Sequence, residues 1–309
     1  MALNYRDFIH PEDAVALEKL QSLAGFDKVM SWMMELGVEE YCQMLYMSNH
    51  IRLSSKQLPK IYNLLPPICE KFGIDVPDFY LQQHPQPSAV TTGDKRCFIV
   101  ITSGLIESVE DSRELQSILA HECGHILCRH VFYSTMAEIL AGFGYELNRW
   151  IPIPTVILEK LEMPLQLAMS YWSRKSELSA DRASAVFTGD ANVSAKALLR
   201  LTAGSSKITR EVNIDEFAKQ VADCDNLKLN SKWRKLLSGY SVMNESHPFA
   251  DARFKELMSW GKSEKFVKLC EALKSGALGR TCSNCGAALE AKQRFCRFCG
   301  SKIQTSRKG

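Results

Sequence analysis

Apolar residues recur at the spacing of one helical face along the first quarter of the chain. They predict three helices, over Asp13 to Leu23, Phe26 to Leu36 and Ser54 to Phe72, with a glycine soon after each to end it. We therefore expect an N-terminal helical region over residues 1–75. A role for this region as a lid or a prosegment is an open alternative.

A different pattern begins near residue 97. Cys97 to Thr102 is rich in β-branched residues, which predicts a strand, and Ser103-Gly104 ends it. Asp111 and Glu114 then form a capping pair before apolar residues at helical spacing, namely Leu115, Ile118, Leu119, Ile126 and Leu127. Together with the N-terminal helices, these elements predict an α+β fold that is mostly helical with a small β-sheet.

Length and composition indicate one large domain and a small module. The chain has 309 residues, of which 46% are hydrophobic and 24% are charged, and its formal net charge is +3. Lys274 to Gly279 is small and flexible, as expected of a linker. We therefore expect three parts: residues 1–75, a central domain over residues 76–273, and a module over residues 280–303.

The sequence also bears on the cellular compartment. The first residues lack the basic and apolar segments of a secretory signal, and the eleven cysteines, an odd number, favour a reducing compartment. No uncharged apolar run approaches the roughly 20 residues that a bilayer requires. In residues 136–172, charged residues interrupt the apolar ones and predict two amphipathic helices instead. We expect a soluble, cytoplasmic protein with no transmembrane segment.

The segment His121-Glu122-Cys123-Gly124-His125 lies inside the predicted helix and suggests metal chemistry. Two histidines four residues apart project from one helical face, so both imidazoles can bind one metal ion. Glu122 lies about 100° further round, where it can reach a water on the metal better than the metal itself. This arrangement predicts a zinc hydrolase in which Glu122 is the general base.

A catalytic zinc usually has three protein ligands, so a third must come from elsewhere. Glu177 and Asp181 are four residues apart and share a helical face. Glu177 can bind the metal while Asp181 accepts a hydrogen bond from the far nitrogen of a ligand histidine. His130 would point to the opposite side of an unbroken helix, so we interpret it as a packed or surface histidine. Cys128 is expected to be a buried thiol.

Four cysteines near the C-terminus predict a zinc ribbon. They form two C-x2-C pairs separated by ten residues, each followed by a glycine that permits a tight turn, at Cys282, Cys285, Cys296 and Cys299. Such a site is structural and closed, and iron in a rubredoxin-like site is the alternative. The segment is basic, but Phe295 and Phe298 are too few to favour a nucleic-acid surface. We expect a protein partner instead.

These motifs together resemble the HtpX and CAAX prenyl protease family of gluzincin zinc metallopeptidases. The resemblance runs from about Leu58 to Leu257 and includes Ser246-His247-Pro248, followed by Arg253. It implies that zinc is held by His121, His125 and Glu177, that Glu122 activates water, and that Asp181 orients His121. It also implies a catalytic role for His247 near the scissile carbonyl. The alternative for His247 is a loop histidine beside a helix start.

The chain departs from the family in two respects. Members often carry Asn-Ala just before the strand, where the asparagine helps to hold the substrate backbone, whereas Pro87-Ser88-Ala89 stands here. We expect Ser88 to supply a weaker hydrogen bond. The best-known members also have membrane-spanning helices around the active site, which this sequence does not predict.

The resulting prediction is a zinc-dependent metalloendopeptidase that acts on extended or unfolded polypeptide and holds one catalytic and one structural Zn²⁺. The substrate would add as a further strand along Phe98, Ile99, Val100, Ile101 and Thr102. One alternative is a scaffold or binding protein with a weak protease site that acts through its ribbon, although a scaffold would not need Glu122. The other is a zinc hydrolase that cleaves a non-peptide amide.

Overall fold

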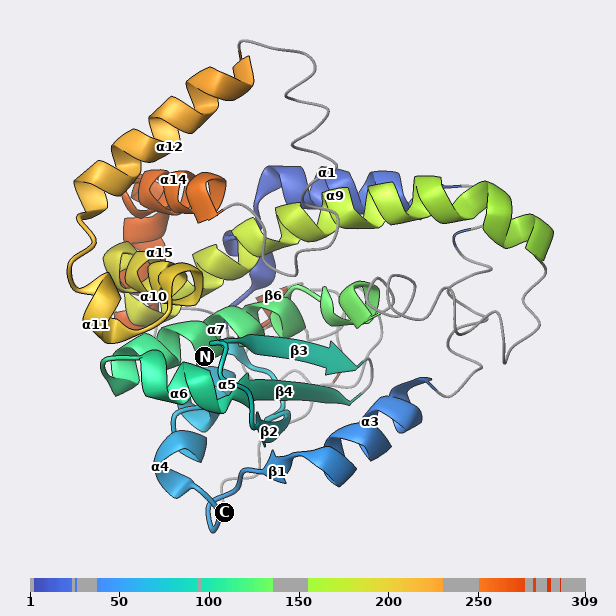
Figure 1. The fold of residues 1–309 in the computed structure, drawn as a ribbon, viewed down its shortest axis with the longest axis horizontal. Helices are drawn as coiled ribbons and strands as arrows, with labels where there is room; N and C mark the ends of the chain where they lie inside the picture. The colour runs from blue at the N-terminus through green and yellow to red at the C-terminus, as the bar shows by residue number, and fades with distance from the viewer. Residues whose placement is uncertain are drawn as a thin grey trace.

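The computed structural model describes residues 3–23, 26, 38–93, 96–135, 155–229 and 250–275, together with residues 280, 281, 288, 289 and 295. Its elements are the 3-10 helix η1 (Tyr5–Asp7), α1 (Pro11–Gln21), α3 (Val38–Asn49), β1 (Ile51–Arg52), α4 (Pro59–Tyr62), α5 (Pro66–Phe72), β2 (Asp78–Gln82), β3 (Ala89–Gly93), β4 (Cys97–Thr102), α6 (Ser103–Ser108), α7 (Ser112–Leu127), α9 (Thr155–Thr188), α10 (Ala191–Ala203), α11 (Ser206–Thr209), α12 (Ile214–Leu229), α14 (Ala250–Gly261), α15 (Glu264–Ser275), β5 (Arg280–Thr281) and β6 (Ala288–Leu289). The predicted α+β class, mostly helical with a small sheet, is confirmed (Figure 1).

The main sheet has the strand order β1-β2-β4-β3. Strand β4 runs parallel to β2 and antiparallel to β3, so strands pair with it on both sides. Alternate residues of the sheet face opposite ways. Ile99 and Ile101 join the core under α5 and α7, whereas Phe98 and Val100 pack with Tyr46 of α3. Helices therefore cover both faces of β4.

This topology corrects the expected substrate-binding strand. The segment from Phe98 to Thr102 is a strand, as predicted, but it lies inside the sheet and its backbone groups are already bonded to β2 and β3. An added strand requires an edge. The described sheet ends at β3, beside α7 (Figure 1).

Helices α7 and α9 form the central helix pair of the molecule. Helix α7 begins where predicted, because the Asp111 side chain accepts a hydrogen bond from the Glu114 backbone. The two helices meet at Gly124, where an added Cβ would lie 2.8 Å from the Ala183 Cβ and 3.2 Å from the Ala180 Cα. Only a residue without a side chain permits this approach.

Helix α1 lies along α9 (Figure 1). Leu20 is fully buried in a small core with Met169 and Trp172 of α9. On the same interface Ser179 of α9 donates a 2.5 Å hydrogen bond to the carboxylate of Asp13, which is also fully buried. The N-terminal segment is therefore packed onto the helix that carries Glu177.

Two expected helices differ from the structure. The helix expected over Ser54 to Phe72 is two short helices, because Pro59 and Pro66 each begin a new helix and cannot donate a backbone hydrogen bond within an older one. Residues 155–172, expected to form part of a pair of separate amphipathic helices, are the beginning of α9. The helix expected over Phe26 to Leu36 lies almost wholly outside the described residues, as do residues 136–154.

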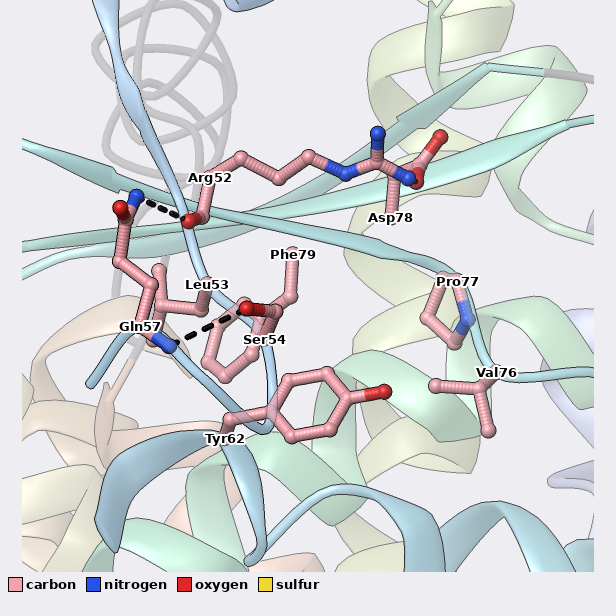
Figure 2. A pocket seen from close by; sticks show the side chains of 9 residues that line it. All are labelled: Arg52, Leu53, Ser54, Gln57, Tyr62, Val76, Pro77, Asp78 and Phe79. Carbon is pink, nitrogen blue, oxygen red and sulfur yellow. Dashed lines mark hydrogen bonds and ion pairs between the residues drawn. The ribbon is translucent and has the colours of Figure 1, made fainter. Parts of the chain in front are cut away.

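A cavity of about 500 Å³ opens at β1 and β2. Figure 2 shows Arg52 extended toward Asp78 at this cavity, with Tyr62 and Phe79 among the side chains that line it. Because β1 and β3 lie at opposite edges of the sheet, the cavity is separate from the residues predicted to bind zinc.

No helix in the described part of the chain combines the length and the apolar character that crossing a membrane requires.

Candidate active site and metal centre

His121, His125 and Glu177 come together in the structure. The Nε2 atoms of the two histidines lie 3.2 Å apart, and each lies 3.4 Å from an oxygen of the Glu177 carboxylate. All three side chains are buried. Helical spacing on α7 brings the two imidazoles to one face, and the close approach of α9 at Gly124 brings Glu177 opposite them.

Asp181 and Arg253 contact this cluster from α9 and α14. Asp181 Oδ1 lies 3.0 Å from His121 Nδ1, as predicted from its position one turn after Glu177. Arg253 of α14 donates two hydrogen bonds to Asp181, of 2.8 and 2.7 Å, and its Nη1 lies 2.9 Å from Glu177. The guanidinium therefore bridges the Glu177 and Asp181 carboxylates.

The charges in this cluster determine its protonation. Burial alone would lower the pKa of His121, but hydrogen bonds to Asp181 and Glu177 outweigh burial and raise it to about 10. Burial would raise the pKa of Asp181, but Arg253 and His121 outweigh that effect and lower it to about 2. Burial lowers the pKa of His125. These neighbours favour positive charge at His121, which is the charge that a bound cation would supply.

The residues present fit a zinc ion. Two imidazoles and a carboxylate, with one position left for water, form a recurrent ligand set of catalytic zinc. The three ligand atoms lie within 4.8 Å of one another, and they are the one such group found in the part of the chain that the structure describes. Arg253 pairs with Glu177 and Asp181, and Glu122 is buried as well, so the buried carboxylates suit a divalent cation.

Glu122 lies beside the edge strand. The hydroxyl of Thr91, on β3, donates a 2.6 Å hydrogen bond to Glu122 Oε2 and lies 3.4 Å from the Glu122 backbone oxygen. Both residues are buried. The Thr91 hydroxyl therefore binds Oε2 of Glu122, the predicted base, and leaves Oε1 available to another group.

His130 is packed, as one of its two expected interpretations had it, but it does not point to the opposite side of a continuous helix. Helix α7 ends at Leu127, and Arg129 adopts a left-handed conformation with φ of 61°, which turns the chain back on itself. His130 is consequently buried, with its Nδ1 3.1 Å from His125 Nδ1 and its Nε2 2.9 Å from Asp13. It is a packed histidine and not a member of the metal-ligating group, but it contacts a ligand.

Several predicted residues are placed elsewhere or not described. Ser88 precedes β3, and its backbone donates a hydrogen bond to the Thr102 hydroxyl. Cys128 is buried and free, as predicted. His247 lies outside the described residues, and so do the four ribbon cysteines. Near them the structure describes only the short antiparallel pair of β5 and β6 and an isolated Phe295.

Sequence reasoning missed four contributors to the site. Thr91 lies in a strand that no sequence pattern predicted. Arg253 was noted in the sequence but was given no role in the site. Asp13 and His130 are 117 residues apart, and only folding brings them together. The one available signal was the position of Asp13 on the apolar face of the first predicted helix, because a charged side chain on that face requires a partner.

A mostly helical domain that places a buried His-His-Glu cluster and a neighbouring glutamate beside a sheet edge is that of a zinc metallopeptidase. The model of Peptidase family M48 matches residues 59–261, and the chain belongs to this family. A zinc-ribbon domain model matches residues 281–303, as the cysteine spacing predicted.

Curated relatives are similar over most of the chain. The plastoglobule-localized metallopeptidase 48 of Arabidopsis thaliana is 29% identical over 269 residues, which covers 86% of this chain and 76% of the relative. A protease HtpX homolog of Trichormus variabilis is 26% identical and covers 78% of this chain and 85% of the relative. Among solved structures, S. mikatae Ste24p matches with a TM-score of 0.43 and 17% identity, covering 79% of this chain and 61% of that one.

Proposed function

We propose that the protein is a metalloendopeptidase that hydrolyses extended or unfolded polypeptide. The observation that carries this proposal is the hydrogen bond between Thr91 and Glu122, because it places the predicted base directly against the edge strand β3. A substrate that added along this strand would present its backbone to Glu122 and to the His121, His125 and Glu177 cluster.

The backbone of β3 supports this placement. Thr102 of β4 donates its backbone N–H to the Ser88 carbonyl, so antiparallel alternation turns the backbone groups of Thr91 away from β4. At the end of the strand Gly93 donates its N–H to the Thr135 hydroxyl and not to β4, which agrees with that alternation. The backbone groups of Thr91 therefore lie on the open edge of the described sheet, while its side chain contacts Glu122 of α7.

The chain's own residues would carry the following roles. His121, His125 and Glu177 would hold Zn²⁺, which when bound supplies Lewis acidity toward a water and the substrate carbonyl. Glu122 would accept the proton of the attacking water and deliver it to the leaving amine. His247 would donate a hydrogen bond to the oxygen of the scissile carbonyl as negative charge develops there.

The cysteine motif adds a second metal ion and a protein partner to the proposed function. We propose two Zn²⁺ ions for each chain, one at the active site and one held by Cys282, Cys285, Cys296 and Cys299. The ribbon would recruit a protein partner rather than nucleic acid. For the compartment we propose the cytoplasm. The odd number of cysteines in the sequence favours a reducing environment, and fractionation of cells would test this compartment.

Peptide cleavage profiling of the wild type beside Glu122→Gln tests the function. The wild type should cleave within unfolded polypeptides and lose activity with a chelator. Glu122→Gln should keep its zinc and lose at least about 100-fold in kcat, since general acid–base assistance contributes 10²–10⁴-fold. Near wild-type turnover by Glu122→Gln would show that Glu122 is not the base. Release of terminal residues alone would contradict an endopeptidase.

A further inference from the structure

We infer that Asp13 and His130 are positioning residues of the metal centre, which fix the orientation of His125 through its second ring nitrogen. The inference deepens the proposed function, because it assumes that His125 binds zinc. It assigns a role to helix α1, whose Asp13 lies outside residues 59–261 that match the peptidase family.

A continuous buried chain of contacts links α1 to the metal ligand. His125 Nδ1 lies 3.1 Å from His130 Nδ1, and His130 Nε2 lies 2.9 Å from Asp13 Oδ2. The same carboxylate accepts the 2.5 Å hydrogen bond from Ser179, whose hydroxyl accepts a 3.0 Å bond from the His10 backbone. His130 and Asp13 are only 1% and 0% exposed, so water cannot replace either contact.

Donor and acceptor roles can be assigned consistently to the atoms of this chain of contacts. His125 turns Nε2 toward His121 and Glu177, so this nitrogen must offer its lone pair to a metal, and the proton must be on Nδ1. That Nδ1–H can donate only if His130 Nδ1 accepts. The proton of His130 is then on Nε2, which faces the Asp13 carboxylate. Each ring nitrogen has one role, and the carboxylate ends the chain.

The two ligand histidines are supported by the same principle in different ways. His121 reaches its carboxylate, Asp181, directly, whereas His125 reaches Asp13 through His130. Such partners of a metal-bound imidazole fix its ring orientation and strengthen it as a ligand. The left-handed turn at Arg129 presents His130 to His125, and the His130 ring packs edge-on against Trp172, with centroids 5.7 Å apart. The intermediate imidazole is thereby held in place from two sides.

The experiment compares Asp13→Asn with Leu20→Ala in the full-length protein. Asp13→Asn keeps the shape of the side chain but removes its charge, whereas Leu20→Ala weakens the same helix interface without touching the chain of contacts. The readouts are the zinc dissociation constant, from competition with a chelator, and the visible absorption of the Co²⁺-substituted protein. Asp13→Asn should weaken zinc binding by about 10- to 100-fold and change the Co²⁺ spectrum. Leu20→Ala should lower the Tm but leave both readouts at wild-type values.

If Asp13→Asn does not fold, His130→Gln and His130→Leu test the inference through the zinc affinity. In His130→Gln the amide can still accept from His125 and donate to Asp13, so zinc affinity should stay near that of the wild type. His130→Leu can do neither and should lose affinity as Asp13→Asn does. Wild-type zinc affinity and Co²⁺ spectrum in both Asp13→Asn and His130→Leu would overturn the inference. So would a loss of zinc affinity in Leu20→Ala as large as that in Asp13→Asn.

The proposed function fails in a different way. If wild-type zinc content and affinity are unchanged by His121→Ala, the metal centre itself is wrong. If His121→Ala loses one of the two zinc ions while Asp13→Asn binds that ion with wild-type affinity, only the role of Asp13 and His130 is wrong.

Discussion

At the scale of single residues, Thr91 is expected to matter through one hydroxyl. We predict that Thr91→Val, which keeps the shape but removes the donor to Glu122, lowers kcat by about 10-fold, a part of the 10²–10⁴-fold that a positioned base contributes. KM and zinc content should change little, and Thr91→Ser should restore the rate. Steady-state kinetics on one peptide would measure this.

The neighbouring threonine provides a matched control. Thr92 is also buried on the same strand, but its hydroxyl forms a hydrogen bond with Thr135 instead of Glu122. Thr92→Val should therefore reduce stability without a specific effect on kcat. Equal rate losses in Thr91→Val and Thr92→Val would mean that the Thr91 hydroxyl only stabilises the strand.

Asp13 also predicts a dependence of stability on pH. Burial raises the pKa of its carboxyl group, but His130 and Ser179 outweigh burial and hold it below the ordinary value. A depressed pKa adds stability that is fully present above the unfolded-state value of about 3.9 and is lost as the pH falls through the folded-state value. The metal-free wild type should therefore exceed Asp13→Asn in unfolding free energy at pH 7 and lose that advantage progressively below about pH 4. Urea unfolding at several pH values measures the difference, and a constant difference would contradict the assignment.

At the scale of elements, the crossing of α7 and α9 controls the distance between the metal ligands. We predict that Gly124→Ala weakens zinc binding by at least about 10-fold, because its Cβ would lie 2.8 Å from the Ala183 Cβ and 3.2 Å from the Ala180 Cα and force the helices apart. This should happen although alanine favours a helix by up to about 1 kcal/mol relative to glycine. Competition with a chelator would measure the affinity.

Removing the opposing methyl group tests the cause. The double variant Gly124→Ala/Ala183→Gly should recover most of the lost zinc affinity, while Ala183→Gly alone should leave it unchanged. If the double variant binds zinc as weakly as Gly124→Ala, the loss does not arise from the contact with the Ala183 methyl group, and the Ala180 backbone, 3.2 Å from the added Cβ, is the contact that remains.

Local periodicity explains which parts of this site the sequence could predict. His121, His125, Glu177 and Asp181 lie on two helices, where spacing determines a shared face, and the structure places all four as spacing indicated. The position of β4 could not be predicted, because strand order depends on pairing between distant segments.

His130 was misplaced for a related reason. The prediction assumed that a helix without glycine or proline continues, but Arg129 adopts a left-handed conformation that tertiary packing imposes. The contact with Asp13 then depends on that turn and on the docking of α1, which no local pattern contains.

At the scale of the whole molecule, the ribbon and the active site should be separable. We predict that Cys282→Ser/Cys285→Ser removes one of two zinc ions and leaves short-peptide kcat/KM within about 10-fold of the wild type, because a structural zinc site folds its own module. Cleavage of a protein substrate should fall if the ribbon recruits it. Elemental analysis and kinetics on both substrate types measure these outcomes.

Two other results would change this view. Faster short-peptide cleavage by the double cysteine variant would indicate that the ribbon restrains the active site. A loss beyond about 10-fold, with the other zinc retained, would make the ribbon part of the active-site architecture.

The cluster of His121, His125 and Glu177, with its supports, draws on α1, α7, α9 and α14, segments that span the chain from Asp13 to Arg253. A ligand that binds only the folded form stabilises it, by about 4 kcal/mol at a free concentration 1,000 times its dissociation constant. In cells short of zinc, more of the protein would lack this stabilisation, and helices α1 and α14 would be held less firmly to α7 and α9. Other proteases would then degrade the protein sooner. The abundance of the enzyme would then follow the supply of its metal, even if its synthesis did not change.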